Sequence, residues 1–234
     1  MYTKSAEFYD ALYHFKDYVA ASVQLDEIIQ QRHPEAQSLL DVGCGTGKHV
    51  ENLRHRYQVE GLDISAELLS VARERCPDVP FHEADMATFK LGRSFDVITS
   101  LFSAIAYVRT LKNLERAVAC MSSHLEPGGL LIIEPWFSPE NYWRGRITAN
   151  FFDKPELKIA WMYTSEIEDN VSIFKINYLV GTPEGVTYFT EKHEMGLFTE
   201  AEYIEAFERA GLAVEHDPKG LFGRGMYIGH KKNG

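Results

Sequence analysis

The chain has 234 residues, 45% hydrophobic and 25% charged, which suffices for one well-cored α/β domain with an elaboration and is too short for two full domains. Its formal net charge of −10 repels phosphate backbones, so DNA and RNA are disfavoured as partners and a small-molecule substrate is expected. No apolar run is long enough to cross a membrane, and the N-terminus shows no signal pattern. The three cysteines are too scattered for a disulfide framework or a zinc site, so we expect a cytoplasmic protein without a metal centre.

Helical and strand patterns alternate through the first 134 residues. Strands are predicted at 38–42, 57–62, 79–83, 95–101 and 130–134, with helices over 17–31, 65–77 and 114–125 and a turn at 127–129. This alternation predicts a parallel sheet with right-handed crossovers, whose ligands lie beyond the carboxyl ends of the strands. Polar residues stand at or near those ends: Asp41, Asp63, Asp85, Ser100 and Glu134.

The pattern changes in the next part of the chain. Strand-like alternation between turn residues recurs at 161–165, 171–178 and 186–190. A helix opened by a capping box at Thr199 and Glu202 follows, and then a last strand at 226–230. We therefore expect a Rossmann-like α/β fold with a mainly parallel sheet and three parts: N-terminal helices and cofactor-binding core over 1–136, an inserted antiparallel substrate flap over 137–195, and a completion of the core sheet over 196–234.

The loop after the first predicted strand carries Gly43, Gly45 and Gly47. Glycine tolerates positive φ and the close approach of a ligand, and the helix that follows offers free N–H groups to a negative group. Two acids accompany the loop, Asp41 before it and Asp63 after the next apolar run. Nicotinamide-binding loops usually read G-x-G-x-x-G with only the later acid, so this pattern argues against an oxidoreductase.

Two acids around a G-x-G-x-G loop resemble the class I S-adenosylmethionine-dependent methyltransferases. The resemblance implies that Asp41 and the loop hold the methionine end of the cofactor and that Asp63 binds the ribose diol. Asp85 and Met86 resemble the position that contacts adenine. The cofactor-binding residues implied in this way are Tyr18, Asp41, Gly43, Cys44, Gly45, Gly47, Asp63, Ile64, Asp85, Met86 and Ser100.

Segments outside this fingerprint resemble the aminosugar N,N-dimethyltransferases, which act on TDP-linked amino sugars in macrolide biosynthesis. These segments include 16–18, and the most specific of them are 124–129, 134–141, 197–199 and 223–225. The resemblance spans nearly the whole chain and implies N-methylation of a nucleotide-linked deoxyaminosugar, once or twice, in antibiotic biosynthesis. The substrate-binding residues implied are Glu134, Trp136, Asn141 and Arg224, with Arg144, Arg146 and Lys219 as further cations for a diphosphate.

Methyl transfer from a sulfonium demands little side-chain chemistry beyond orienting a neutral amine and excluding water. Tyr107 and Tyr2 are the candidate bases, but an ordinary tyrosine, with a pKa near ~10, is a poor base at neutral pH. Gly43, Asp63 and Tyr107 stand where the family commonly has alanine, glutamate and histidine. None of the isolated histidines, among them His49, His55, His124 and His193, is expected to be a base.

Three alternatives remain open at this point. The chain could be an N- or O-methyltransferase of another small natural product or metabolite, a nicotinamide oxidoreductase, or a module that binds S-adenosylmethionine without turnover. The sequence also leaves the oligomeric state open, with a homodimer among the arrangements.

Overall fold

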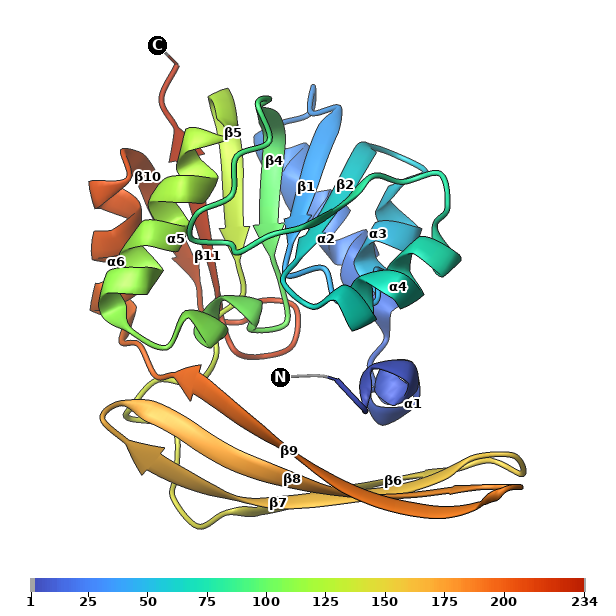
Figure 1. The fold of residues 1–234 in the computed structure, drawn as a ribbon. Helices are drawn as coiled ribbons and strands as arrows, with labels where there is room; N and C mark the ends of the chain where they lie inside the picture. The colour runs from blue at the N-terminus through green and yellow to red at the C-terminus, as the bar shows by residue number, and fades with distance from the viewer. Residues whose placement is uncertain (1–2, 234) are drawn as a thin grey trace.

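The computed structural model describes residues 3–233 and contains two sheets, shown in Figure 1. The larger sheet has seven strands in the order β10-β11-β5-β4-β1-β2-β3. Its strands are β1 (Ser38–Val42), β2 (Gln58–Asp63), β3 (Phe81–Glu83), β4 (Phe95–Ser100), β5 (Leu125–Ile133), β10 (Leu212–Asp217) and β11 (Met226–Lys231). Strands β1 to β5 pair in parallel, and β11 runs antiparallel to both β5 and β10. The predicted mainly parallel sheet is confirmed.

Helices cover both faces of this sheet. They are α2 (Tyr18–Arg32), α3 (Lys48–Leu53), α4 (Ala66–Arg75), α5 (Leu111–Ser123) and α6 (Glu200–Arg209). The short helix α1 (Tyr9–Leu12) lies between the two sheets instead (Figure 1), and the 3₁₀ helices are η1 (Ala6–Phe8) and η2 (Ala104–Val108). Helices α5 and α6 pack on one face through residues such as Val118 and Phe207. Helices α2, α3 and α4 pack on the other through Leu25, Val50 and Leu69. Burial on both faces explains why the central strands are continuously apolar.

Side chains cap the starts of α2, α4 and α6, and the capping box predicted at Thr199 and Glu202 is confirmed. The Asp17 side chain accepts the backbone N–H of Ala20 at 2.9 Å, which places the first turn of α2 directly after Lys16. Ser65 caps α4, and Thr199 with Glu202 forms a complete capping box at α6.

The second sheet is the predicted flap. It contains β6 (Ile147–Asp153), β7 (Lys158–Glu168), β8 (Val171–Thr182) and β9 (Gly185–Gly196), all antiparallel. It lies beneath the carboxyl ends of the parallel strands in Figure 1, with the N-terminal segment between the two sheets. Its inner face is apolar and buried, with Trp161, Phe174 and Tyr178 at its centre.

The outer face of the flap also carries large apolar side chains, which are exposed. The cross-strand register places these residues on one side of the sheet: Ile147, Phe151, Met162, Leu179, Val186 and Tyr188. Exposed apolar side chains gathered on one face are typical of an interaction surface.

One local prediction was wrong, and two strands were not predicted. Residues 127–129 were expected to form a turn before a strand at 130, but they lie inside β5, where Gly128 has a φ of +81° and the β4–β5 register shifts. The glycine backbone therefore bends the strand without ending it. The edge strands β6 and β10 were not predicted, because each has only one partner and a mixed polar sequence. No helix within residues 3–233 is long and apolar enough to span a membrane.

Candidate active site

A cavity of about 980 Å³ is lined by residues at the carboxyl ends of the parallel strands and by residues of the flap. Its wall on the sheet side includes Gly43, Asp63 and Met86, and its wall on the flap side includes Trp161 and Phe174. The volume is within the range of roughly 300–1,000 Å³ that small-molecule sites occupy. The cavity is large enough to hold two ligands against each other.

The glycine loop leaves the sheet side of this cavity open. Gly43 has a φ of +78°, and a Cβ there would lie 2.4 Å from the Cβ of Ala104, so a side chain would collide with η2. Gly45 has a φ of +55°, and a Cβ there would meet nothing within 4 Å. The first glycine thus permits close packing of the loop, and the second keeps free space beside the backbone.

Asp63, at the end of β2, is fixed in the cavity wall by the backbone. Its carboxylate accepts the N–H groups of Gly45 and Ser65, each at 2.9 Å. Burial raises the pKa of Asp63, while these N–H groups act in the opposite direction. A carboxylate has about four lone-pair sites, so acceptor capacity remains for a ligand diol.

Asp41 and Ser100 lie deeper than Asp63. The Thr99 hydroxyl donates to Asp41 at 2.8 Å, and Asp41 is 2% exposed. Burial raises the pKa of Asp41 to about 7, against the effect of the Thr99 hydrogen bond and together with that of the Asp63 charge. The Ser100 hydroxyl is fully buried and has no hydrogen-bond partner among the described residues.

The N-terminal segment closes one side of the cavity. Asp10 accepts the Thr46 hydroxyl at 2.8 Å and pairs with Arg75, which ties α1 to the glycine loop. Glu191 of the flap accepts the backbone N–H groups of Thr3 and Ser5 at 2.9 and 3.2 Å. Burial alone would raise the pKa of Glu191, but hydrogen bonds from the Ser5 hydroxyl and from the N–H groups of Thr3 and Ser5 hold it below its usual range. The segment thus bridges the core and the flap.

Aromatic side chains form the wall opposite the glycine loop. Tyr163 and Phe174 stack with ring centroids 4.7 Å apart. The Trp136 indole N–H donates to the Ser172 hydroxyl at 3.0 Å, which fixes the position of the ring. Aromatic faces held in this way suit the apolar faces of a sugar ring and exclude water from it.

A cluster of charged groups lies beside this wall. The Lys16 amine nitrogen lies 2.7 Å from the ring centroid of Phe102 and has no hydrogen-bond partner among residues 3–233. Arg224 donates to the Ser103 hydroxyl at 2.8 Å. Burial and the neighbouring Arg224 lower the pKa of Lys16 to about 6, while Glu134 opposes the shift. Two basic side chains held this close together provide a site for a multiply charged anion.

Tyr107, on η2, lies in the cavity wall with its hydroxyl 2.8 Å from Nδ1 of His193 on β9. His193 is 1% exposed and stacks on Phe174 with an interplanar angle of 9°. Burial lowers the pKa of His193 to about 4, so the imidazole is neutral at physiological pH.

Comparison with known proteins places this site in a family. A methyltransferase-domain profile matches residues 39–129. The chain is 39% identical over 228 residues, 96% of each chain, to the dTDP-3-amino-3,4,6-trideoxy-alpha-D-glucopyranose N,N-dimethyltransferase of Streptomyces venezuelae. It is 40% identical over 227 residues, 96% of this chain and 91% of the other, to the dTDP-4-amino-2,3,4,6-tetradeoxy-D-glucose N,N-dimethyltransferase of Saccharopolyspora spinosa. The chain belongs to the sugar N,N-dimethyltransferase family.

Solved structures agree with this assignment. DesVI of Streptomyces venezuelae superposes with a TM-score of 0.93 at 38% identity, covering 99% of this chain and 100% of DesVI. An S-adenosylmethionine-bound amino pentose methyltransferase from Micromonospora echinaspora superposes with a TM-score of 0.88 at 33% identity, covering 99% and 98%. The predicted class I methyltransferase fold, enzyme class and cofactor are confirmed.

In this methyltransferase, part of the predicted cofactor set lines the cavity: Gly43, Gly45, Asp63, Ile64, Asp85 and Met86. The rest of the set does not: Tyr18, Asp41, Cys44, Gly47 and Ser100. Asp41 and Ser100 are buried at the strand ends behind the loop, and Cys44 is buried within the loop. Gly47 precedes α3 with a φ of +74°, and a Cβ there would lie 3.2 Å from that of Ala72. Its local role is packing of the loop against α4.

Some of the residues predicted for the acceptor side line the cavity, and others do not. Trp136, Arg224 and Tyr107 line the cavity of the methyltransferase. Glu134 does not, because it is fully buried, with its carboxylate accepting the Phe102 N–H at 2.6 Å. Asn141 is exposed and accepts the Ser138 N–H at 2.8 Å, a turn contact. Tyr2 lies outside the described residues.

The expected help of other cations for Arg224 needs correction. Arg144, Arg146 and Lys219 do not line the cavity, and Arg144 instead donates to the Ile167 carbonyl at 2.9 Å. Lys16 lies beside Arg224 in the wall of the methyltransferase cavity, and Arg109, Arg116 and Lys192 are further cations that line the same cavity.

Sequence reasoning missed Lys16 and His193 as site residues. Lys16 belongs to a segment, 16–18, that resembles the family, so a signal was present. His193 had none, because its contact with Tyr107 joins residues 86 positions apart.

Proposed function

We propose that this methyltransferase transfers a methyl group from S-adenosylmethionine to the amino group of a nucleotide-linked deoxyaminosugar. The single observation that carries the proposal is the cavity itself. It has a fixed carboxylate, Asp63, on the sheet side, aromatic walls, and the basic pair Lys16 and Arg224 at another edge.

The residues present fit the cofactor. Asp63 retains acceptor sites for a ribose diol, and Ile64 and Met86 offer apolar surface to an adenine. We propose that Asp41 supports the loop from behind. Its hydrogen bond with Thr99 ties the end of β1, from which the loop begins, to β4.

The bound cofactor would supply an activated methyl carbon for transfer to a neutral acceptor amine. The chain's own residues orient the acceptor and exclude water. Trp136, Tyr163 and Phe174 would hold the sugar ring, and Lys16 and Arg224 the diphosphate. The Tyr107 hydroxyl would accept a hydrogen bond from the amine while His193 fixes its direction.

We further propose that the parts of the chain divide this work. Residues 1–136 and 196–234 would form the cofactor-binding core, and 137–195 would form the substrate flap.

The apolar outer face of the flap suits a second copy of the chain, because identical apolar faces are self-complementary in a twofold dimer. Light scattering of wild type and Leu179→Lys tests this: a dimer that becomes a monomer is expected, and a monomeric wild type contradicts it.

Activity measurements test the function directly. TDP-linked 3-amino- and 4-amino-deoxysugars should be methylated in the presence of S-adenosylmethionine, and the matching 3-hydroxy and 4-hydroxy sugars should not. Methylation of only the hydroxy sugars would identify an O-methyltransferase. Methylation of free amino sugars as efficient as that of the TDP-linked forms would remove the role assigned to Lys16 and Arg224.

A further inference from the structure

The contact between Tyr107 and His193 joins the core to the flap at the cavity wall. Tyr107 is on η2, and His193 is on β9, where its ring stacks on that of Phe174, its cross-strand neighbour, with centroids 5.4 Å apart. The Tyr107 hydroxyl oxygen lies 2.8 Å from Nδ1 of His193. Because His193 is buried and contacts both rings, its imidazole is held in one orientation.

The geometry of η2 places Tyr107 beside the glycine loop. Side chains at i and i+3 of a 3₁₀ helix lie on the same face, so Tyr107 shares a face of η2 with Ala104. Ala104 packs against the loop, since a Cβ on Gly43 would lie 2.4 Å from the Cβ of Ala104. All three residues line the cavity. The Tyr107 phenol therefore stands next to the part of the cavity wall that the loop forms.

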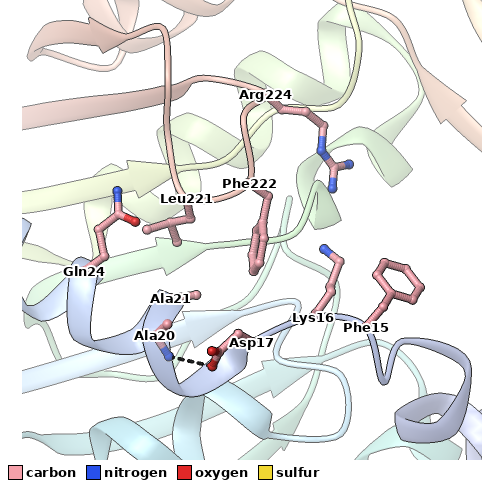
Figure 2. A pocket seen from close by; sticks show the side chains of 9 residues that line it. All are labelled: Phe15, Lys16, Asp17, Ala20, Ala21, Gln24, Leu221, Phe222 and Arg224. Carbon is pink, nitrogen blue, oxygen red and sulfur yellow. Dashed lines mark hydrogen bonds between the residues drawn. The ribbon is translucent and has the colours of Figure 1, made fainter.

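The other end of the proposed substrate is held elsewhere. The proposed function places the diphosphate at Lys16 and Arg224, whose basic groups point toward one another in Figure 2. With the diphosphate at these cations, the sugar would extend into the cavity and its amine would reach the Tyr107 phenol.

The hydrogen bond between Tyr107 and His193 has a preferred direction. Burial lowers the pKa of His193 to about 4, so its ring is neutral, with one nitrogen that donates and one that accepts. A phenol is a stronger acid than a neutral imidazole N–H, and an imidazole nitrogen is a stronger base than a phenol oxygen. The Tyr107 hydroxyl therefore donates to Nδ1, which leaves the phenol oxygen as an acceptor in the cavity wall.

We propose that Tyr107 and His193 form an acceptor pair that orients the substrate amine in both rounds of methylation, with His193 as the positioning residue. Because its proton is directed to Nδ1, the phenol accepts an amine N–H and does not occupy the nitrogen lone pair, which must be available to form the new bond. The hydrogen bond strengthens as the nitrogen becomes positively charged, so it favours the transition state over the bound amine. This inference rests on the proposed function and adds to it what controls the second methylation.

The number of N–H groups on the amine limits the reaction to two rounds. Each round moves one methyl carbon from the sulfonium sulfur to the nitrogen, and the resulting ammonium releases one proton to water. A primary amine can meet the phenol oxygen through either of two N–H groups, and a neutral monomethylated amine through only one. The second round therefore depends more strongly on the acceptor pair, and the neutral dimethylated amine has no N–H left to donate.

Two substitutions at His193 separate positioning from packing. His193→Leu removes the acceptor, whereas His193→Asn keeps an amide oxygen near the position of Nδ1. His193→Leu should lower kcat/KM for the TDP-linked primary amine roughly 2- to 13-fold, the range that corresponds to one neutral hydrogen bond. It should lower kcat/KM for the monomethylated amine further, so that this product accumulates. His193→Asn should stay within about twofold of wild type.

Two controls show whether His193 acts through the phenol. In the Tyr107→Phe background, His193→Leu should cause no further loss beyond about twofold, because the oxygen that it directs is absent. Phe189→Leu loosens the packing of the same face of β9 without touching the cavity wall and should leave both kcat/KM values unchanged. Wild-type kcat/KM for both amines in His193→Leu, or an equal loss in both backgrounds, would overturn the proposal.

A measurement on the wild-type protein without ligands serves if His193→Leu does not fold. Long-range proton–nitrogen NMR correlation distinguishes the two neutral forms of a histidine. The signal of His193, identified by its absence in His193→Asn, should show a proton on Nε2 and none on Nδ1. A proton on Nδ1 would overturn the proposal and leave the proposed function standing. A wild-type protein that methylates no TDP-linked amino sugar would instead refute the proposed function, and the role of the acceptor pair with it.

Discussion

Asp63 provides the sharpest test of the cofactor site. Its carboxylate is held by the Gly45 and Ser65 N–H groups at 2.9 Å and lines the cavity. A hydrogen bond to a charged group contributes about 1.5–3 kcal/mol. Asp63→Ala should therefore weaken binding of S-adenosylmethionine and of its demethylated product by roughly 10- to 150-fold, since about 1.4 kcal/mol corresponds to a factor of ten.

The same substitution affects the free protein. It leaves the N–H groups of Gly45 and Ser65 without their acceptor, at a cost of about 1–3 kcal/mol for each one that water does not reach. Calorimetry must therefore be performed well below the melting temperature of the variant. Asp63→Asn keeps one acceptor oxygen and should bind with intermediate affinity.

Asp78→Ala is the matched control. Asp78 is largely exposed and pairs with Arg54 at the surface, so its removal should change neither cofactor affinity nor stability by more than about 1 kcal/mol. Equal dissociation constants for wild type and Asp63→Ala, with both proteins folded, would refute the assignment of the diol site to Asp63.

Three further predictions concern the acceptor side. Arg224→Ala should raise the KM for the nucleotide-linked sugar by roughly tenfold or more while cofactor affinity stays within about twofold, and an unchanged KM would remove the diphosphate site. Because the pKa of Lys16 is lowered to about 6, this amine is mostly neutral at pH 8, so binding of a diphosphate should raise its pKa and take up a proton. Calorimetry in buffers with different ionisation enthalpies should detect that uptake in wild type and not in Lys16→Met. Proton uptake in both wild type and Lys16→Met would assign the proton to another group. Tyr107→Phe should lower kcat by less than ~10²-fold, with rates that rise with pH as the free amine fraction grows, and a loss of several orders of magnitude with binding intact would make Tyr107 a catalytic base.

The sequence by itself determined the local elements and the chemistry attached to them. The side chains of Asp17, Ser65 and Thr199 start helices by accepting hydrogen bonds from N–H groups three residues away, so their effect is readable from a short window. The glycine loop and Asp63 were readable for a similar reason. Each follows or ends a predicted strand, and neighbouring parallel strands end at the same edge of the sheet.

Only the tertiary structure decided which distant side chains meet. Lys16, Glu134 and Arg224 come from three parts of the chain, and their mutual influence on pKa exists only once the N-terminal segment and the C-terminal loop pack together. The contact of Tyr107 with His193 likewise depends on how the flap docks against η2. Hydrophobic periodicity predicts which face of a strand is buried, but it carries no information on which element covers that face, because apolar burial is non-directional.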